Sequence, residues 1–189
     1  PPTLVDFFGD AFGGSVATAT IPQQMFTASN LRSWCSDEPS VIWIAPEIDE
    51  PFSVGAEAIA AIKGAQQLTT FCVTGGSLDA DAIDALKRFP NLAALQFSCN
   101  GQPLPEGLLS LDQLTFLTLE DAVINDTLLE TVSELQNLRG LRIENARSIG
   151  PIKNLIRLEL NGRIQIHYSD INPLDLQTLG AIRGDLIFM

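Results

Sequence analysis

The chain has 189 residues, 46% of them hydrophobic, and a mean hydropathy of +0.18. This composition excludes an intrinsically disordered chain, and the length suffices for one well-buried core. The formal net charge of −12, from 11 basic and 23 acidic residues, argues against nucleic acid or an anionic membrane as the partner, because both require basic patches. The charge favours a rapid encounter with a basic partner, although an acidic surface that serves solubility alone is the simpler interpretation.

The N-terminal part of the chain, up to Ser40, is rich in aromatic side chains and carries no repeat. One apolar cluster consists of Leu4, Val5, Phe7, Phe8 and Phe12, and a second, with helix-like spacing, of Met25, Phe26, Leu31 and Trp34. Gly13-Gly14 separates the clusters and interrupts any regular element. We predict that residues 1–40 form an N-terminal cap for the elements that follow. An exposed aromatic docking tail is the alternative.

A buried strand and a helix are expected next. The apolar run Val41–Ala45 predicts the strand, with Ile42 and Ile44 in the core. Ser53 is a candidate N-cap for a helix that includes residues 57–63, where alanine and isoleucine recur at helical spacing.

Between Leu68 and Gly162 one short pattern, apolar-x-x-apolar-x-apolar, occurs five times. The copies begin at Leu68, Leu92, Leu114, Leu138 and Leu155, so their spacing is nearly constant except for a shorter last step. Side chains of a strand alternate between two faces, so the fourth and sixth positions of each copy lie on one face. These positions are Phe71/Val73, Leu95/Phe97, Leu117/Leu119, Leu141/Ile143 and Leu158/Leu160. We predict that they form one apolar layer, which the first leucine of each copy covers at the start of the strand.

A fixed pattern that recurs at about 20–29 residues resembles the leucine-rich-repeat family, and the resemblance covers about half of the chain. It implies an α/β solenoid in which a parallel sheet lines the concave side, while helices and loops form the convex side. Residues 41–162 would form the solenoid, between the N-terminal cap and a C-terminal cap over residues 163–189, all in one domain. Five unrelated amphipathic strands in an ordinary α/β domain are the alternative.

Two helices are expected between the copies. Ser77 is a candidate N-cap for a helix over residues 79–89, whose acidic first half and basic last turn suit the helix dipole. Asn125 or Asp126 opens a helix over residues 127–135.

The other connections are too short or too rich in proline for a helix. Residues 100–110 should be extended or form a short turn, and residues 147–151 leave room only for a tight loop. The family's usual asparagine lies eight residues after the first leucine, where its side chain satisfies backbone groups in the turn. The corresponding positions here are Gly76, Asn100, Ala122, Ala146 and Arg163. Since only Asn100 matches, other groups must satisfy the turns.

Asn161-Gly162 lies between two alternating stretches, which is a hairpin signal. A two-residue loop would pair Leu160 with Arg163 and place the two apolar sets on opposite faces. We favour a three-residue loop, which pairs Leu160 with Ile164. The stretch 164–168 would then be an antiparallel strand that closes the edge of the sheet.

Residues that support catalysis or metal binding are scarce. The chain has one histidine, His167, and no acidic residue at a spacing that orients it, so a surface histidine is the simplest interpretation. Asp79-x-Asp81 lacks the glycine and the distal glutamate of a calcium loop. Gly75-Gly76 before a helix is a weak phosphate-binding signal. We therefore expect no enzymatic activity, no metal and no cofactor.

The three cysteines, Cys35, Cys72 and Cys99, have no metal-binding spacing, and an odd count gives no disulfide framework. This favours a reducing compartment and a cytoplasmic location, with a secreted effector as the alternative.

In the leucine-rich-repeat family, the side chains between the layer residues form the concave surface that contacts partners. Aromatic and arginine residues are enriched at binding hot spots, so Phe116, Arg142 and Arg157 are the predicted anchors. The other candidates are the charged residues Glu120, Arg139, Glu144 and Glu159. A solvated sheet face that binds nothing is the alternative.

We expect non-catalytic protein binding through this face, as a small acidic adaptor or as an inhibitor of a basic partner. A second hypothesis follows from the resemblance to bacterial effector ubiquitin ligases. In those proteins such a domain is the substrate-recognition module of a larger enzyme.

Overall fold

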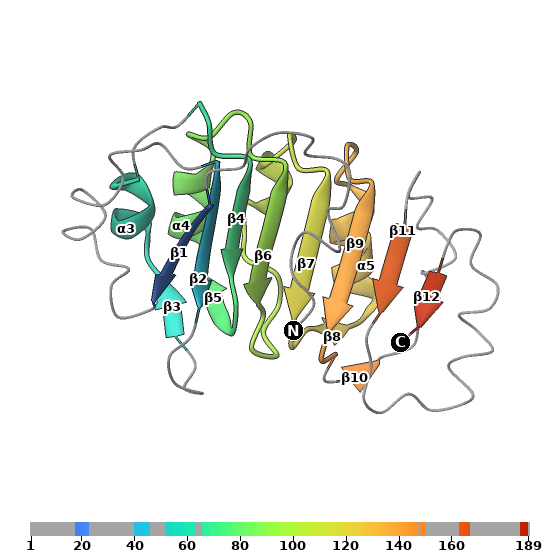
Figure 1. Ribbon diagram of the computed structural model, residues 1–189. Coiled ribbons are helices and arrows are strands. Elements are labelled where there is room, and N and C mark those ends of the chain that lie inside the picture. The colour runs from blue at the N-terminus through green and yellow to red at the C-terminus, as the bar shows by residue number, and fades with distance from the viewer. Residues whose placement is uncertain are drawn as a thin grey trace.

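The computed structural model describes residues 18–22, 40–45, 52–62, 66–146, 148–149, 163–166 and 186–188. Its main element is one sheet of eight parallel strands, whose order across the sheet follows their order in the chain (Figure 1). The strands are β1 (Thr18–Pro22), β2 (Val41–Ala45), β4 (Thr70–Val73), β6 (Ala94–Ser98), β7 (Phe116–Glu120), β9 (Gly140–Glu144), β11 (Arg163–Ile166) and β12 (Leu186–Phe188). The predicted α/β class and parallel sheet are confirmed.

The register of this sheet repeats at a nearly constant separation along the chain. Phe71 lies beside Leu95, Leu95 beside Leu117 and Leu117 beside Leu141. The next step, from Leu141 to Ile164, has nearly the same length in sequence. The chain therefore makes one crossover per strand and returns each time to the adjacent position.

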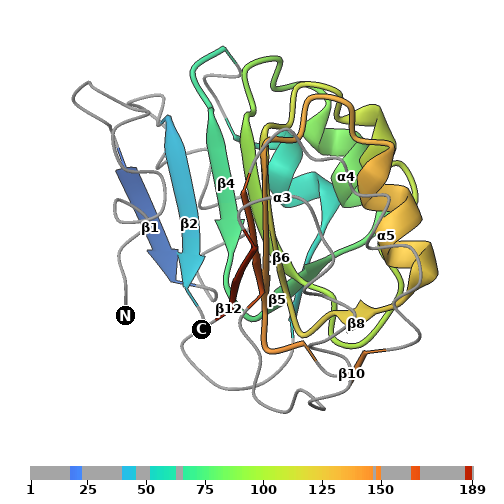
Figure 2. The same ribbon diagram turned by 90° about the vertical axis from the view of Figure 1, so that its right-hand side faces the viewer.

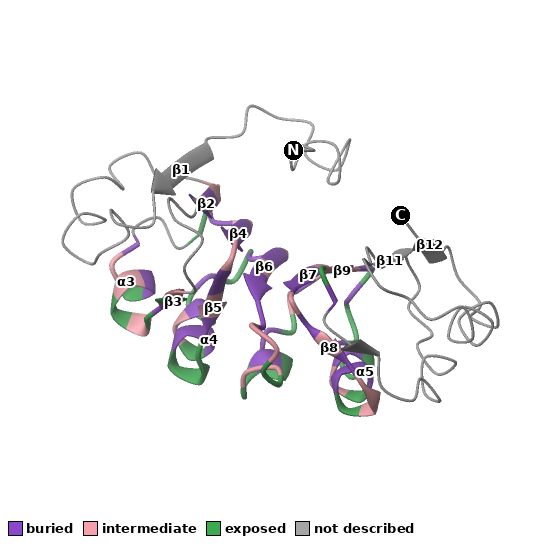
Figure 3. Ribbon diagram, turned by 90° about the horizontal axis from the view of Figure 1, so that it is seen from below, coloured by how far each residue is buried: buried purple, intermediate pink, exposed green. Residues whose placement is uncertain are grey.

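Helices cover one face of the sheet (Figure 2). They are α3 (Ala56–Ala60), α4 (Ala80–Leu86), the 3₁₀ helix η4 (Leu108–Ser110) and α5 (Asp126–Ser133). Buried residues follow the strands and the inner sides of the helices (Figure 3). The predicted layer residues on β4, β6, β7 and β9 are at most 2% exposed: Phe71, Val73, Leu95, Phe97, Leu117, Leu119, Leu141 and Ile143. The layer is confirmed for these four strands, and Ile42 and Ile44 of β2 are buried as expected.

The two serines predicted as N-caps lie in strands instead. Ser53 belongs to β3 (Phe52–Val54) and Ser77 to β5 (Gly76–Leu78), which pair in parallel as a separate two-stranded sheet. Ser77 Oγ donates to the carbonyl of Phe52 at 3.2 Å, so the hydroxyl joins the two strands. The N-cap positions of the two helices are Gly55 and Asp79. The predictions were wrong because strand pairing takes up the residues before each helix.

Short polar side chains cap α4 and α5. The side chain of Asp79 accepts from the backbone N–H of Ala82 at 2.7 Å, and that of Asn125 from Leu128 N–H at 2.9 Å. Both residues have extended backbones, as N-caps do. The prediction that Asn125 opens a helix is confirmed. The stretch 100–110 contains only the short η4, as its prolines led us to expect.

Further strands lie in stretches for which none was predicted. β1, within the predicted N-terminal cap, extends the main sheet beside β2. Residues 147–151, predicted as a tight loop, include β10 (Ser148–Ile149), which pairs in parallel with β8 (Val123–Ile124). β10 has only two residues, too few for an alternating pattern, whereas β1 is as long as β2 but has a single large apolar residue, Ile21.

The prediction that residues 164–168 form an antiparallel closing strand is wrong. β11 pairs in parallel with β9 on one side and with β12 on the other. This register places Ile164 beside Leu141 and Ile166 beside Ile143, so the apolar alternation of the sheet continues. The expected fifth repeat strand, residues 155–160, lies outside the described residues, and its expected place beside β9 is taken by β11. The sequence separation from Leu141 to Ile164 matches the separations between the other paired strands. The separation from Leu141 to Leu158 would have been shorter.

A ladder of side-chain amides joins successive crossovers, although not at the family's usual position. Asn91 Nδ2 donates to Gln66 O at 2.7 Å, Gln113 Nε2 to Phe89 O at 3.2 Å, and Asn137 Nδ2 to Asp112 O at 2.8 Å. Each amide residue comes directly before the first leucine of a copy, and Gln67 and Asn154 occupy the same position in the other two. The pattern is therefore amide-apolar-x-x-apolar-x-apolar, a regularity that we did not predict.

Three of the five positions that correspond to the family's asparagine, Gly76, Ala122 and Ala146, are filled by buried small residues. Ala122 and Ala146 are at most 5% exposed, and a Cβ added to Gly76 would lie 2.5 Å from the ring of Phe52. An asparagine has no room at Gly76, whereas Asn100 occupies the same position in the second copy. The chain turns one residue earlier, where Gly75, Asp121 and Asn145 have positive φ values of 69°, 51° and 50°. Glycine, asparagine and aspartate are the residues that tolerate this conformation.

Candidate functional site

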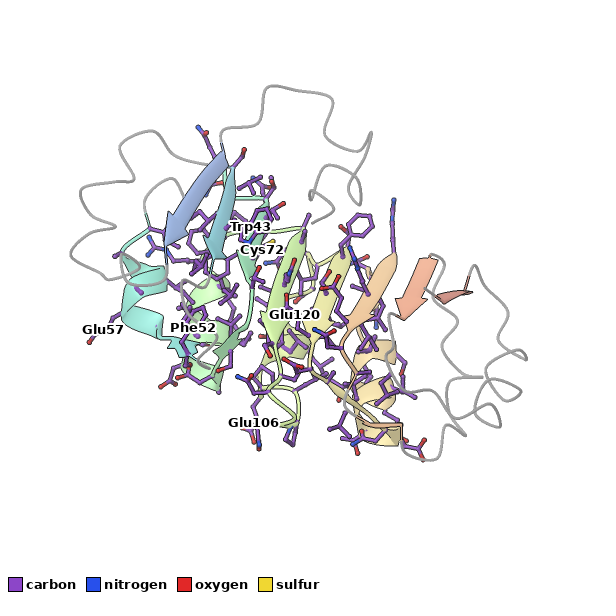
Figure 4. All side chains as sticks on the ribbon, turned by 60° about the horizontal axis from the view of Figure 1, so that its bottom comes forward. Trp43, Phe52, Glu57, Cys72, Glu106 and Glu120 are labelled. Atoms are coloured by element: carbon purple, nitrogen blue, oxygen red, sulfur yellow. The ribbon has the colours of Figure 1, made fainter. Side chains whose placement is uncertain are left out.

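The helix-free face is the side of the main sheet that points away from α3, α4 and α5. The register arranges its side chains in three rows across neighbouring strands. The first row is Val41, Thr70, Ala94, Phe116 and Gly140; the second is Trp43, Cys72, Gln96, Thr118 and Arg142; the third is Ser98, Glu120 and Glu144. Trp43, Cys72 and Glu120 lie along the sheet in Figure 4, whereas Glu57 and Glu106 lie at the periphery.

Glu120 joins three crossovers of the chain. Its Oε2 accepts from the backbone N–H of Gly75 at 2.7 Å, and its Oε1 accepts from Gln96 Nε2 at 2.6 Å. Gly75 lies in the turn after β4, Gln96 on β6 and Glu120 on β7, so one carboxylate spans all three. The side chain is 6% exposed. Glu120 therefore supports the sheet from within the helix-free face.

Burial raises the pKa of the Glu120 carboxyl above its ordinary value of 4.5. The hydrogen bonds from Gly75 and Gln96 oppose this by stabilising the charged form, and the carboxylates of Glu144 and Asp121 add to the rise. Ionisation of the Glu120 carboxyl is thus disfavoured relative to a free carboxyl group.

Phe116 lies flat against the backbone of the next strand. A Cβ added to Gly140 would be 2.5 Å from Cδ1 of the Phe116 ring. Glycine is therefore required opposite this phenylalanine, because any side chain would displace the ring. The ring itself is partly exposed. Phe116 combines a fixed orientation with accessible aromatic surface.

Arg142 and Glu144 form an ion pair on β9, beside Phe116. Arg142 Nη2 lies 2.5 Å from Glu144 Oε1, and the side chains are 14% and 27% exposed. The pair lies on the strand adjacent to that of Phe116, so two neighbouring strands carry an aromatic, a cationic and an anionic side chain on this face. Arg139, directly before β9, is exposed.

The structure places five of the seven predicted site residues on or beside the helix-free face. Phe116, Arg139, Arg142 and Glu144 retain accessible surface, whereas Glu120 is buried and engaged within the protein. Arg157 and Glu159 lie outside the described residues, as does His167.

Trp43 belongs to this face and was not among the predicted site residues. It occupies the second row on β2, is partly exposed, and its Nε1 donates to Thr74 Oγ1 at 2.8 Å. A signal was present in the sequence, because Ile42 and Ile44 were expected in the core. Strand alternation then requires the residue between them to point the other way.

The described thiols are poor candidates for chemistry. Burial is the main cause that raises the pKa of both Cys72 and Cys99 to about 12, and the carboxylate of Glu120 adds to both rises. A thiol must ionise to act as a nucleophile or metal ligand, so both are inert at neutral pH. Among the described residues, no three histidine, cysteine, aspartate or glutamate side chains gather as a metal site would require.

A small pocket lies on the helix side, between the loop at residues 101–104 and α5. Its volume is about 200 Å³, and Leu104, Val123 and Leu128 contribute to its lining. Ligand-binding pockets are usually about 300–1,000 Å³. The pocket is too small for most ligands. The helices in the described ranges include none long and apolar enough to cross a membrane.

The helix-free face is therefore the candidate site, with Phe116, Arg142 and Glu144 at its centre. Comparisons of the chain with family models, with curated proteins and with solved structures found no match.

Proposed function

We propose that this protein is an irregular leucine-rich-repeat solenoid that binds another protein through the helix-free face and carries out no catalysis. The constant register steps of the main sheet and the amide ladder at Asn91, Gln113 and Asn137 support the repeat architecture. Both features are expected when each repeat contacts only its neighbours.

The grouping of Phe116, Arg142 and Glu144 on adjacent strands is the observation that carries the binding role. Aromatic and arginine side chains contribute most to hot spots, which are usually surrounded by contacts that exclude water. Phe116 is held in place by the backbone of Gly140, and Arg142 by Glu144. Side chains that are already ordered lose little conformational entropy when a partner binds.

The chemistry of the face indicates a partner with both apolar and basic groups. Phe116 and Trp43 offer aromatic surface at two points, while Glu144 and the overall charge of −12 favour a basic surface opposite. Opposite charge accelerates encounter, and the aromatic contacts slow dissociation. We propose the role of an acidic adaptor or inhibitor for this chain.

The test is affinity capture from the native source with a site variant and a matched control. The site variant is Phe116→Ala/Arg142→Ala. The control, Leu109→Ala/Lys87→Ala, removes one apolar and one cationic side chain from exposed positions on the helix side. We expect the site variant to lose a protein that the wild type and the control retain. Identical capture by all three folded proteins would refute the helix-free face as the binding site.

A further inference from the structure

The layer of helices is interrupted at the crossover between β6 and β7. This crossover contains only η4, whereas the crossovers before and after it contain α4 and α5. Pro103 and Pro105 account for the difference, because proline lacks a backbone donor and disfavours the interior of a helix. The neighbouring crossovers also begin with a short strand, β5 or β8, and this one does not. A gap beside α5 is therefore a consequence of the two prolines.

The pocket described above lies at this gap. Leu104, Val123 and Leu128 give it an apolar lining, and Thr127 and Thr131, about one turn apart on α5, form part of its wall. Its volume of about 200 Å³ is too small for most free ligands but suits a single side chain. An apolar cavity of about 150 Å³ binds benzene, so a phenylalanine ring or a branched aliphatic group fits.

The charges around the pocket are all negative. Residues 89–138 include acidic side chains but no lysine, arginine or histidine. Glu106 follows Leu104 in the loop, at the outer edge of the molecule (Figure 4), and Glu130 lies on α5 three residues after Thr127. Both glutamates are exposed, and residues three apart on a helix are neighbours on its surface. A partner would therefore meet negative charge on both sides of an apolar pocket.

The adjacent surface at α4 is different, because it carries cations as well. Lys87 pairs with Asp84 at 2.6 Å, and Arg88 donates to the carbonyl of Ala60. The acidic side chains of α4 are thus partly balanced within the protein. The part of the helix side that carries negative charge alone coincides with the pocket.

We propose that the pocket beside α5 is a second docking site, which takes a basic peptide segment of a partner protein and holds one bulky apolar side chain. Lysine or arginine residues on either side of that side chain would lie against Glu106 and Glu130. Opposite charges accelerate the encounter, and the apolar anchor slows dissociation. The pocket lies on the opposite side of the sheet from Phe116, so this site does not depend on the function proposed for the helix-free face.

The test is fluorescence anisotropy of the full chain with a labelled synthetic peptide, Lys-Arg-Phe-Arg-Lys. In two matched peptides, alanine replaces the phenylalanine or glutamate replaces the four cations. We expect the first peptide to bind about tenfold more tightly than the alanine peptide, because burial of the ring stabilises the complex. Equal affinity of these two peptides would overturn the proposal, since charge alone would then explain binding. Absence of binding at about 1 mM peptide would also overturn it.

A variant of α5 tests whether the anchor enters the pocket. Thr131→Phe places a ring in the pocket wall, whereas Ser133→Phe adds the same ring at an exposed position that does not line the pocket. We expect Thr131→Phe to weaken binding of the phenylalanine peptide about tenfold and Ser133→Phe to leave it unchanged. Equal binding by the two folded variants would overturn the proposal.

A second pair of variants tests the charges. Glu106→Gln/Glu130→Gln removes two charges beside the pocket, and the control, Glu57→Gln/Asp81→Asn, removes two from α3 and α4. Both change the net charge equally. We expect only the first to weaken binding, by about fivefold or more at low salt, and this difference should shrink as salt screens the surface charges. Equal effects of the two pairs would show that overall charge is responsible and would overturn the site.

Amide chemical shifts of the wild type locate the peptide without any substitution, even if Thr131→Phe unfolds the protein. Shifts at Leu104, Val123 and Thr131 would support the proposal. Shifts confined to the strands, with binding lost in Phe116→Ala/Arg142→Ala, would overturn it and assign the peptide to the helix-free face. Affinity capture through the helix-free face can fail without affecting these measurements, so the two proposals fail separately.

Discussion

Glu120 provides the sharpest test of how the helix-free face is held together. Two substitutions separate its geometry from its charge. Glu120→Ala removes the acceptor for both Gly75 and Gln96, whose donors lie 2.7 and 2.6 Å from the carboxylate. Glu120→Gln preserves the shape, because the Gln96 amide can reverse and accept from the new amide while the remaining oxygen still accepts from Gly75.

The magnitudes follow from the hydrogen bonds and the burial. Bonds to a charged acceptor contribute about 1.5–3 kcal/mol each, and the lower end applies because both donors are partly exposed. Removal of a buried charge offsets part of this loss, so Glu120→Ala should cost about 1–2 kcal/mol at neutral pH. Glu120→Gln should remain within about 1 kcal/mol of the wild type.

The pH dependence has a definite sign. The pKa of Glu120 is raised in the folded protein, so the native state binds more protons than the unfolded state at pH values above 4.5. The stability contributed by this group is complete below its ordinary pKa and is lost as the pH rises through the folded pKa. The free energy of unfolding of Glu120→Gln should therefore rise relative to wild type as the pH increases from 5 toward 8.

The assay is urea unfolding of wild type and both variants at several pH values from about 5 to 8, which avoids the pI of about 4.3. Parallel pH profiles for wild type and Glu120→Gln would refute a buried carboxylate at this position. A Glu120→Ala protein as stable as wild type would refute the bridge across the three crossovers.

Three further outcomes are expected. Leu117→Asp should unfold the protein, since Leu117 is 1% exposed and an unpaired carboxylate there costs at least about 4 kcal/mol. A native-like thermal melt of this variant would contradict the assignment of Leu117 to the apolar layer. Gly140→Ala should lower the free energy of unfolding by about 1–3 kcal/mol, because the added methyl group clashes with the Phe116 ring. Most of this loss should disappear in a Phe116→Ala background. Additive losses in the double-mutant cycle would count against the contact. Cys72 and Cys99, with pKa values of about 12, should resist alkylation at pH 8 until urea is added, and rapid alkylation of the folded protein would show that the two thiols are accessible.

The site was predictable to the extent that strand alternation governs it. Once Leu117 and Leu119 are assigned to the core, Phe116 and Glu120 must lie on the other face, and the structure places them there. The same rule would have found Trp43 between Ile42 and Ile44. Alternation does not say whether a residue on that face is accessible, and Glu120 is not, because Gly75 and Gln96 enclose its carboxylate.

Prediction failed where two local preferences competed. Ser53 and Ser77 are good N-cap residues, yet pairing of β3 with β5 places both in strands. Asn161-Gly162 is a good hairpin signal, yet the stretch that follows pairs in parallel with β9. In each case the decision depends on a partner strand that lies a whole crossover away in the chain, which no local pattern describes.

The sequence by itself determined the strands of the first four copies and their apolar layer, because alternation and apolar burial are properties of neighbouring residues. Only the tertiary structure decided that Glu120 reaches the turn at Gly75, two crossovers earlier in the chain, and that Phe116 requires a glycine on the next strand. These contacts depend on the register between strands. That register follows from how the whole core packs, and a single strand carries too little information to specify it.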